Sequence, residues 1–171
     1  MLYVSRYSNP ELKKGIYTAV RISIGVPKWP LGYQITGEIS DLMPWGMLNK
    51  YSHEEFVVRY REKLENIGVE KIRRYLRSYE RIGKPVVLLC YEDIRVKGQT
   101  CHRTTFAEWW KEKTGEDVKE LEDPSIPKGE KVETKNQSVS KAELRAKKRN
   151  EELIKQREME LAQISVFDLL I

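Results

Sequence analysis

Long apolar runs and an export leader are both missing from this sequence. No stretch approaches the ~18 apolar residues that a membrane-spanning helix needs. The first residues lack the basic start, apolar stretch and small-residue cleavage site of a secretory signal. A charged fraction of 33% and a hydrophobic fraction of 40% are typical of water-soluble proteins. We therefore expect a cytoplasmic protein with no membrane partner.

Cysteines are also few, because the 171 residues include only Cys90 and Cys101. The cytosol keeps thiols reduced, so we expect both to be free for chemistry rather than joined in a structural disulfide. The net charge of +5 is modest. It permits contact with nucleic acid but does not by itself argue for it.

The spacing of apolar residues predicts an α/β domain. Strands are predicted at 3–5, 17–24 and 86–90, and helices at 53–67, 69–82 and 106–114. The run at 86–90 is apolar throughout, which is typical of a strand buried on both faces of a parallel sheet. The sequence therefore predicts a small three-layer α/β domain over residues 1–123, with a mostly parallel sheet and this strand at its centre.

Reactive side chains gather at two points that follow this central strand. Cys90 and Glu92 lie at its carboxyl end, where open α/β sheets present their ligand-binding residues. Cys101, His102 and Arg103 lie at the start of the next helix, whose dipole favours an anion and lowers the pKa of a thiol. We predict that these groups share a cavity, with Cys101 as the nucleophile. Glu92, His102 and Cys90 complete the catalytic set, and Arg103 binds an anionic group.

Other interpretations of the same residues remain open. Cys90 is equally well explained as a small core residue, because free cysteine is among the most buried residue types. Cys101, His102 and Arg103 could instead form a capped helix start with a structural ion pair. The spacing of these residues favours neither a zinc site nor a redox pair of the two cysteines, and no metal or cofactor is predicted.

Residues after the first two predicted strands are candidates for the same pocket. Arg6 and Tyr7 follow the first strand, and Lys28 and Trp29 follow the second. The two cations would hold an anionic substrate, and Trp29 could stack against a base or a sugar. Packing on the domain is the alternative explanation for aromatic residues of this loop.

The motifs on the central strand and the following helix resemble the domain of unknown function 488 family. The resemblance is carried by Leu88-Leu89-Cys90-Tyr91-Glu92 and Cys101-His102-Arg103, with support from Ser23-x-Gly25-x-Pro27-Lys28-Trp29 and Tyr60-Arg61-x-x-Leu64. It covers residues 1–121. The resemblance implies a small α/β fold in which the two cysteine motifs face a shared pocket, and it supplies neither a reaction nor a cofactor.

The last third of the chain has a different composition. Residues 124–140 form a predicted linker, residues 141–162 a predicted charged helix, and residues 163–171 an apolar docking peptide. The peptide resembles the motif by which bacterial replication and repair proteins bind the DNA sliding clamp. The proposed contact residues are Gln163, Ile164, Ser165, Val166, Phe167 and Leu169. Packing of this segment against its own domain, or dimerisation through it, is the alternative.

These features favour an enzyme that acts on DNA or a nucleotide and is recruited to the sliding clamp by its tail. A non-catalytic adaptor or nucleotide-binding module that binds the clamp is the alternative. A third hypothesis is a thiol or sulfur-transfer enzyme unrelated to DNA.

Overall fold

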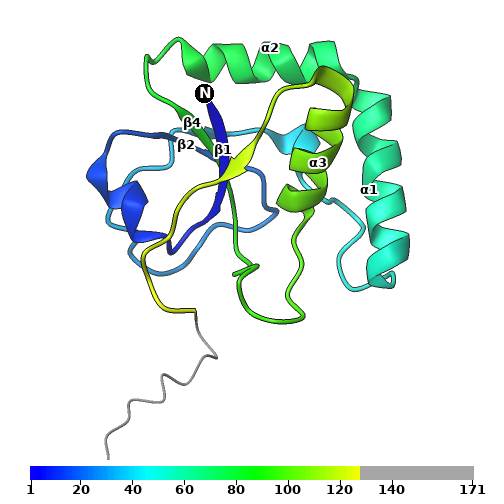
Figure 1. The fold of residues 1–171 in the computed structure, drawn as a ribbon, viewed down its shortest axis with the longest axis horizontal. Helices are drawn as coiled ribbons and strands as arrows, with labels where there is room; N and C mark the ends of the chain where they lie inside the picture. Colours follow the sequence, from blue (N-terminus) through cyan, green and yellow to red (C-terminus); the bar gives the residue numbers. More distant parts are fainter. Residues whose placement is uncertain (128–171) are drawn as a thin grey trace, which may run out of the picture. The chain divides into compact units, whose positions relative to one another are not determined.

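The computed structural model describes residues 1–127 (Figure 1). Its strands are β1 (Leu2–Arg6), β2 (Thr18–Arg21), β3 (Gly37–Glu38), β4 (Val86–Cys90) and β5 (Lys119–Glu120). The α-helices are α1 (His53–Ile67), α2 (Val69–Glu80) and α3 (His102–Thr114). Two short 3-10 helices complete the set, η1 (Pro10–Lys14) and η2 (Ser40–Leu42). The predicted charged helix and docking peptide lie outside the described residues.

The five strands form one all-parallel sheet in the order β3-β2-β4-β1-β5. Leu88 in the middle of β4 is opposite Val4 of β1 on one side and Val20 of β2 on the other. Every residue of β4 is buried, as expected for a strand with neighbours on both edges and cover on both faces. The α/β class, the parallel sheet and the central position of β4 are therefore confirmed.

The two faces of the sheet are covered differently. On one face, Val86 and Leu88 pack with side chains from all three α-helices: Tyr60, Leu64, Ile72, Leu76, Phe106, Trp109 and Trp110. On the other face, Val87 and Leu89 pack with Leu12 of η1 and with Leu31, Tyr33 and Ile35 of the loop after β2. Figure 1 shows α1, α2 and α3 on one side of the strands and η1 on the opposite side. The third layer therefore consists of a 3-10 helix and a loop.

The ends of the helices follow from local chemistry. The Ser52 hydroxyl accepts a hydrogen bond from the Glu55 amide, and the Glu55 carboxylate accepts one from the Ser52 amide, which forms a capping box at the start of α1. Gly115 ends α3 with a left-handed φ of 74°. The start of α3 differs from the prediction, because the helix begins at His102, four residues before Phe106. Cys101 is therefore the N-cap residue.

Within residues 1–127, no helix is long and apolar enough to cross a membrane.

Candidate functional site

Four reactive side chains meet at the carboxyl end of β4. The Cys90 thiol donates a hydrogen bond to the Glu92 carboxylate, with Sγ and Oε2 3.0 Å apart. The Nδ1 atom of His102 lies 3.6 Å from the Cys90 sulfur and 3.8 Å from the Cys101 sulfur. The short loop after β4 returns the chain to the N-terminus of α3, and this return places the two cysteine motifs against each other.

The orientation of the His102 ring is fixed by the backbone of the neighbouring strand. Its Nε2 atom lies 3.0 Å from the carbonyl oxygen of Ile22, just after β2. A carbonyl oxygen only accepts, so Nε2 carries a hydrogen and Nδ1 is the nitrogen left to exchange a proton with the thiols. Tyr60 of α1 packs edge-on against the ring, with centroids 5.3 Å apart. These two contacts hold Nδ1 toward both sulfur atoms.

The surroundings shift the pKa values of the two thiols in opposite directions. Burial raises the pKa of the Cys101 thiol, but the hydrogen bonds from Cys90 and His102 outweigh this effect and lower the pKa to about 6. The hydrogen bond with Cys101, followed by burial, raises the pKa of Cys90. Burial raises the pKa of Glu92, but hydrogen bonds from both cysteines outweigh it and lower the value. Near neutral pH the site therefore holds one thiolate, on Cys101.

A cavity of about 190 Å³ opens over this cluster. Cys101, His102 and Glu92 line it, together with Thr100 and Thr105. Its other wall comes from the segment before α1 and the first turn of α1: Met47, Leu48, Asn49, Tyr51, Ser52, His53 and Phe56. No pattern in the sequence indicates this second wall, because the N-termini of α1 and α3 come together only through packing of the two helices on the sheet.

Arg103 does not line this cavity, although the sequence places it beside His102. Its side chain is fully buried, and its Nε and Nη2 atoms donate to the two carboxylate oxygens of Glu120 in β5, each at 3.0 Å. Within residues 1–127, its Nη1 atom has no hydrogen-bond partner. Arg103 therefore acts on the thiols through its charge, while its planar fork is occupied by a carboxylate of the same chain.

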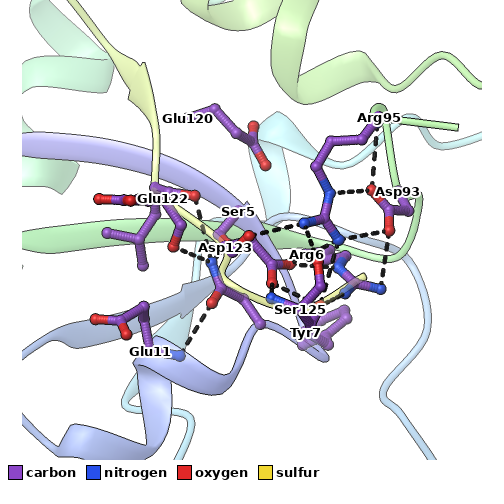
Figure 2. Close-up of polar contacts among 12 residues, drawn as sticks. Ser5, Arg6, Tyr7, Glu11, Asp93, Arg95, Glu120, Glu122, Asp123 and Ser125 are labelled. Carbon is purple, nitrogen blue, oxygen red and sulfur yellow. Dashed lines mark hydrogen bonds and ion pairs between the residues drawn. The ribbon is translucent and has the colours of Figure 1, made fainter. Parts of the chain in front are cut away.

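Arg6 is also engaged within the domain (Figure 2). Its Nε atom donates to Asp123 at 2.7 Å, its Nη1 atom lies 3.1 Å from Asp93, and its Nη2 atom donates to Ser125 at 2.6 Å. Arg95 contacts the same two aspartates, at 2.8 and 3.2 Å. We call Arg6, Asp93, Arg95, Asp123 and Ser125 the Arg6 network. All three guanidinium nitrogens of Arg6 are engaged, so its charge is already compensated.

A second cavity, of about 600 Å³, accounts for only part of the other predicted pocket residues. Trp29 lines it, next to Tyr91 and Glu92. Tyr7 is buried beneath it, where its hydroxyl shares a hydrogen bond of 2.6 Å with Ser23. Lys28 is exposed on the loop after β2 and lines neither of these two cavities. Glu92 borders both cavities, so they are adjacent.

The cluster also has the chemistry to hold a soft divalent metal ion. The ligand atoms of Cys90, Cys101 and His102 all lie within 4.8 Å of one another, and all three residues are buried. Thiolate and imidazole groups are the ligands that zinc prefers. Any test of thiol chemistry at this site therefore needs a metal-free control.

No family model, curated protein or solved structure matches this chain. The resemblance to the domain of unknown function 488 family stays a prediction from the sequence. The proposed contact residues of the docking peptide lie outside the described residues.

Proposed function

We propose that this protein is a thiol-dependent enzyme that acts on nucleic acid or a nucleotide, with Cys101 as its nucleophile. One observation carries the proposal: Cys101 lines a cavity and lies beside Nδ1 of a histidine whose other nitrogen is held by the Ile22 carbonyl. A nucleophile next to a base that is itself oriented by a third group is the usual arrangement in covalent catalysis.

The neighbouring groups have matching roles in this proposal. The Cys101 thiolate gives its electron pair to an electrophilic atom of the substrate, and the bond from that atom to the leaving group breaks. The leaving group departs with that bonding pair and takes a proton from His102, which is protonated in the thiolate form of the pair. Cys90 remains a thiol and donates to Glu92, which keeps the carboxylate oriented at the edge of the cavity.

The nucleic-acid part of the proposal rests on the sequence of the tail. Gln163, Ile164, Ser165 and Phe167 match the clamp-binding pattern, in which a glutamine enters a polar pocket and the aliphatic and aromatic residues enter an apolar one. A docking peptide on a tether raises the local concentration of the enzyme at replicating DNA. We therefore propose the DNA sliding clamp as the partner.

A non-catalytic adaptor is the second candidate, and the engagement of Arg103 by Glu120 favours it. This pair matches a structural ion pair at a capped helix start. Replacement of the Cys101 sulfur by oxygen separates the two functions. The Cys101→Ser variant would keep the binding properties of an adaptor but would lose all thiol chemistry.

Thiol reactivity is the test of the enzyme proposal. Alkylation with iodoacetamide, followed by mass-spectrometric mapping, gives separate rates for the two cysteines across a range of pH. We expect Cys101 to react faster than Cys90, with its rate half-maximal near a pH of about 6. The protein is first treated with a chelator and then desalted, so that a metal ion on the thiols cannot mask them. Faster labelling of Cys90 would contradict the proposal.

Clamp binding is tested separately, with the full chain. Replacing both Gln163 and Phe167 with alanine should abolish binding to a bacterial sliding clamp while leaving the thermal transition of the α/β domain unchanged. Gln156→Ala, in the predicted charged helix, is the matched control and should bind as the parent does. Equal clamp binding by the double variant would remove the replication link.

A further inference from the structure

The second cavity has an aromatic wall that the thiol chemistry does not use. Trp29 and Tyr91 form it, and they are 46% and 36% exposed. Their ring centroids lie 5.9 Å apart at an interplanar angle of 67°. Exposed aromatic residues that gather in a cavity commonly mark a ligand site, because a soluble domain otherwise gains by burying them.

The Tyr91 ring is held in place from the protein side. Tyr7 packs edge-on against it with centroids 4.9 Å apart, and Tyr7 is itself fixed by its hydrogen bond with Ser23. The loop after β2 also approaches closely, because a Cβ atom at Gly25 would lie 3.1 Å from the Tyr91 hydroxyl. The Tyr91 side of the aromatic wall is therefore ordered before a ligand binds, which reduces the entropic cost of binding.

The charges around this cavity do not suit a phosphate group. Arg6 lies at its edge, but its guanidinium is compensated by Asp93 and Asp123. The remaining polar groups on the wall include the half-buried Glu92 carboxylate and the exposed Gln99 amide. A carboxylate accepts hydrogen bonds and repels anions, so the cavity favours a ligand part that carries N–H donors.

We propose that this cavity binds a nucleobase that carries N–H donors, with its flat face on Trp29, the Tyr91 ring at its side and its donor edge toward Glu92. The volume of about 600 Å³ accepts a group of this size. Because Glu92 also borders the Cys101 cavity, the bound base lies beside the thiolate. The inference rests on the proposed function, since it names the part of a nucleic-acid substrate that the site recognises.

Fluorescence anisotropy with two single-stranded oligonucleotides tests the proposal on the full chain. The two probes are identical except at one central position, which carries either adenine or an abasic sugar. Removal of base–aromatic stacking corresponds to a loss of about 5- to 150-fold in affinity. We expect the parent to bind the adenine probe at least about fivefold more tightly than the abasic probe. Equal binding of the two probes would overturn the proposal.

Matched variants locate the base in the cavity. Trp29→Ala should abolish the preference for adenine, and Trp29→Phe should retain part of it, because phenylalanine still offers a flat ring. Trp45→Ala is the control, since Trp45 is also exposed, at 54%, but lines another cavity beside α1. It should leave the preference unchanged. Equal losses in the Trp29→Ala and Trp45→Ala variants would place the base elsewhere and overturn the proposal.

Two further arms identify the source of the base and separate this proposal from the thiol chemistry. Adenosine monophosphate should compete only weakly, because a strand adds contacts of its phosphates with basic groups outside the cavity. Full displacement at equal concentration would overturn the strand as the source. Loss of the adenine preference in a protein whose Cys101 is still alkylated faster than Cys90 would overturn the nucleobase site alone. An unreactive Cys101 in a protein that still prefers adenine would overturn the thiol chemistry alone.

Discussion

Replacement of Arg6 by methionine should destabilise the domain without weakening the binding of an anionic ligand. The Arg6, Asp93 and Asp123 side chains are 9%, 10% and 7% exposed, and Arg6 contacts both carboxylates. Removing one partner of a buried ion pair costs about 3–5 kcal/mol, because the remaining charge loses its compensation. Arg95 still reaches both aspartates in the variant, at 2.8 and 3.2 Å. We therefore expect the lower end, a loss of about 3 kcal/mol.

Urea unfolding followed by circular dichroism measures this loss in the free energy of unfolding. Arg61→Met is the matched control, because the 2.8 Å pair of Arg61 with Glu112 is 33% and 57% exposed. An exposed pair contributes less than about 1 kcal/mol. The Arg6 variant should therefore lose at least twice as much stability as the Arg61 variant.

Equal losses in the two variants would refute the assignment of Arg6 to the fold. An Arg6→Met protein that unfolds like the parent but binds an anionic ligand more weakly would restore the anion-binding role predicted from the sequence. We expect the Arg6 variant to lose stability because Asp93, Asp123 and Ser125 engage the Arg6 guanidinium (Figure 2).

Three further results are expected from the same unfolding assay. The hydrogen bond from Arg95 lowers the pKa of Asp93 to about 2. The ionised Asp93 therefore contributes about 2 kcal/mol to the free energy of unfolding above pH about 4, and this contribution is lost as the pH falls toward 2. Unchanged stability between these values would contradict this. The Glu120→Gln variant leaves the Arg103 charge in the core without its counterion and should lose about 2 kcal/mol of stability. This is less than for a fully buried pair, because Glu120 is 32% exposed. Unchanged stability would show that Arg103 is compensated elsewhere. Leu88→Ala removes a fully buried side chain from the central strand and should cost about 2–5 kcal/mol, and a loss below 1 kcal/mol would contradict the packing.

The local elements were predictable because their signals lie within short stretches of chain. The apolar run of β4 and the helix over 53–67 are read from neighbouring residues, and both are confirmed. The short strands β3 and β5 were not predicted, because each has only two residues and is defined by its pairing with a longer strand. The Arg6 network could not be predicted from the sequence, since Arg6 and Asp123 are 117 residues apart.

The convergence of the two cysteine motifs was predictable from the order strand, loop and helix. The prediction that the Arg103 side chain faces the same cavity was wrong. Successive residues of a helix point about 100° apart, so the side chain of Arg103 leaves α3 in a different direction from that of His102. Arg103 instead shares the core-facing side of α3 with Phe106 and Trp110, three and seven residues later. Applying the helical period from Cys101 onward would have assigned Arg103 to the core.

Protection of Cys101 by a ligand tests the central claim most directly, because it asks whether the thiolate and the aromatic cavity form one site. The rate of Cys101 alkylation is measured by mass spectrometry in chelator-treated protein, with and without a saturating single-stranded oligonucleotide that contains adenine. We expect the oligonucleotide to slow labelling of Cys101 in the parent and in the Trp45→Ala variant, and to protect Cys101 much less in the Trp29→Ala variant at the same concentration. Equal labelling rates with and without the oligonucleotide, at a concentration that saturates binding, would contradict the central claim.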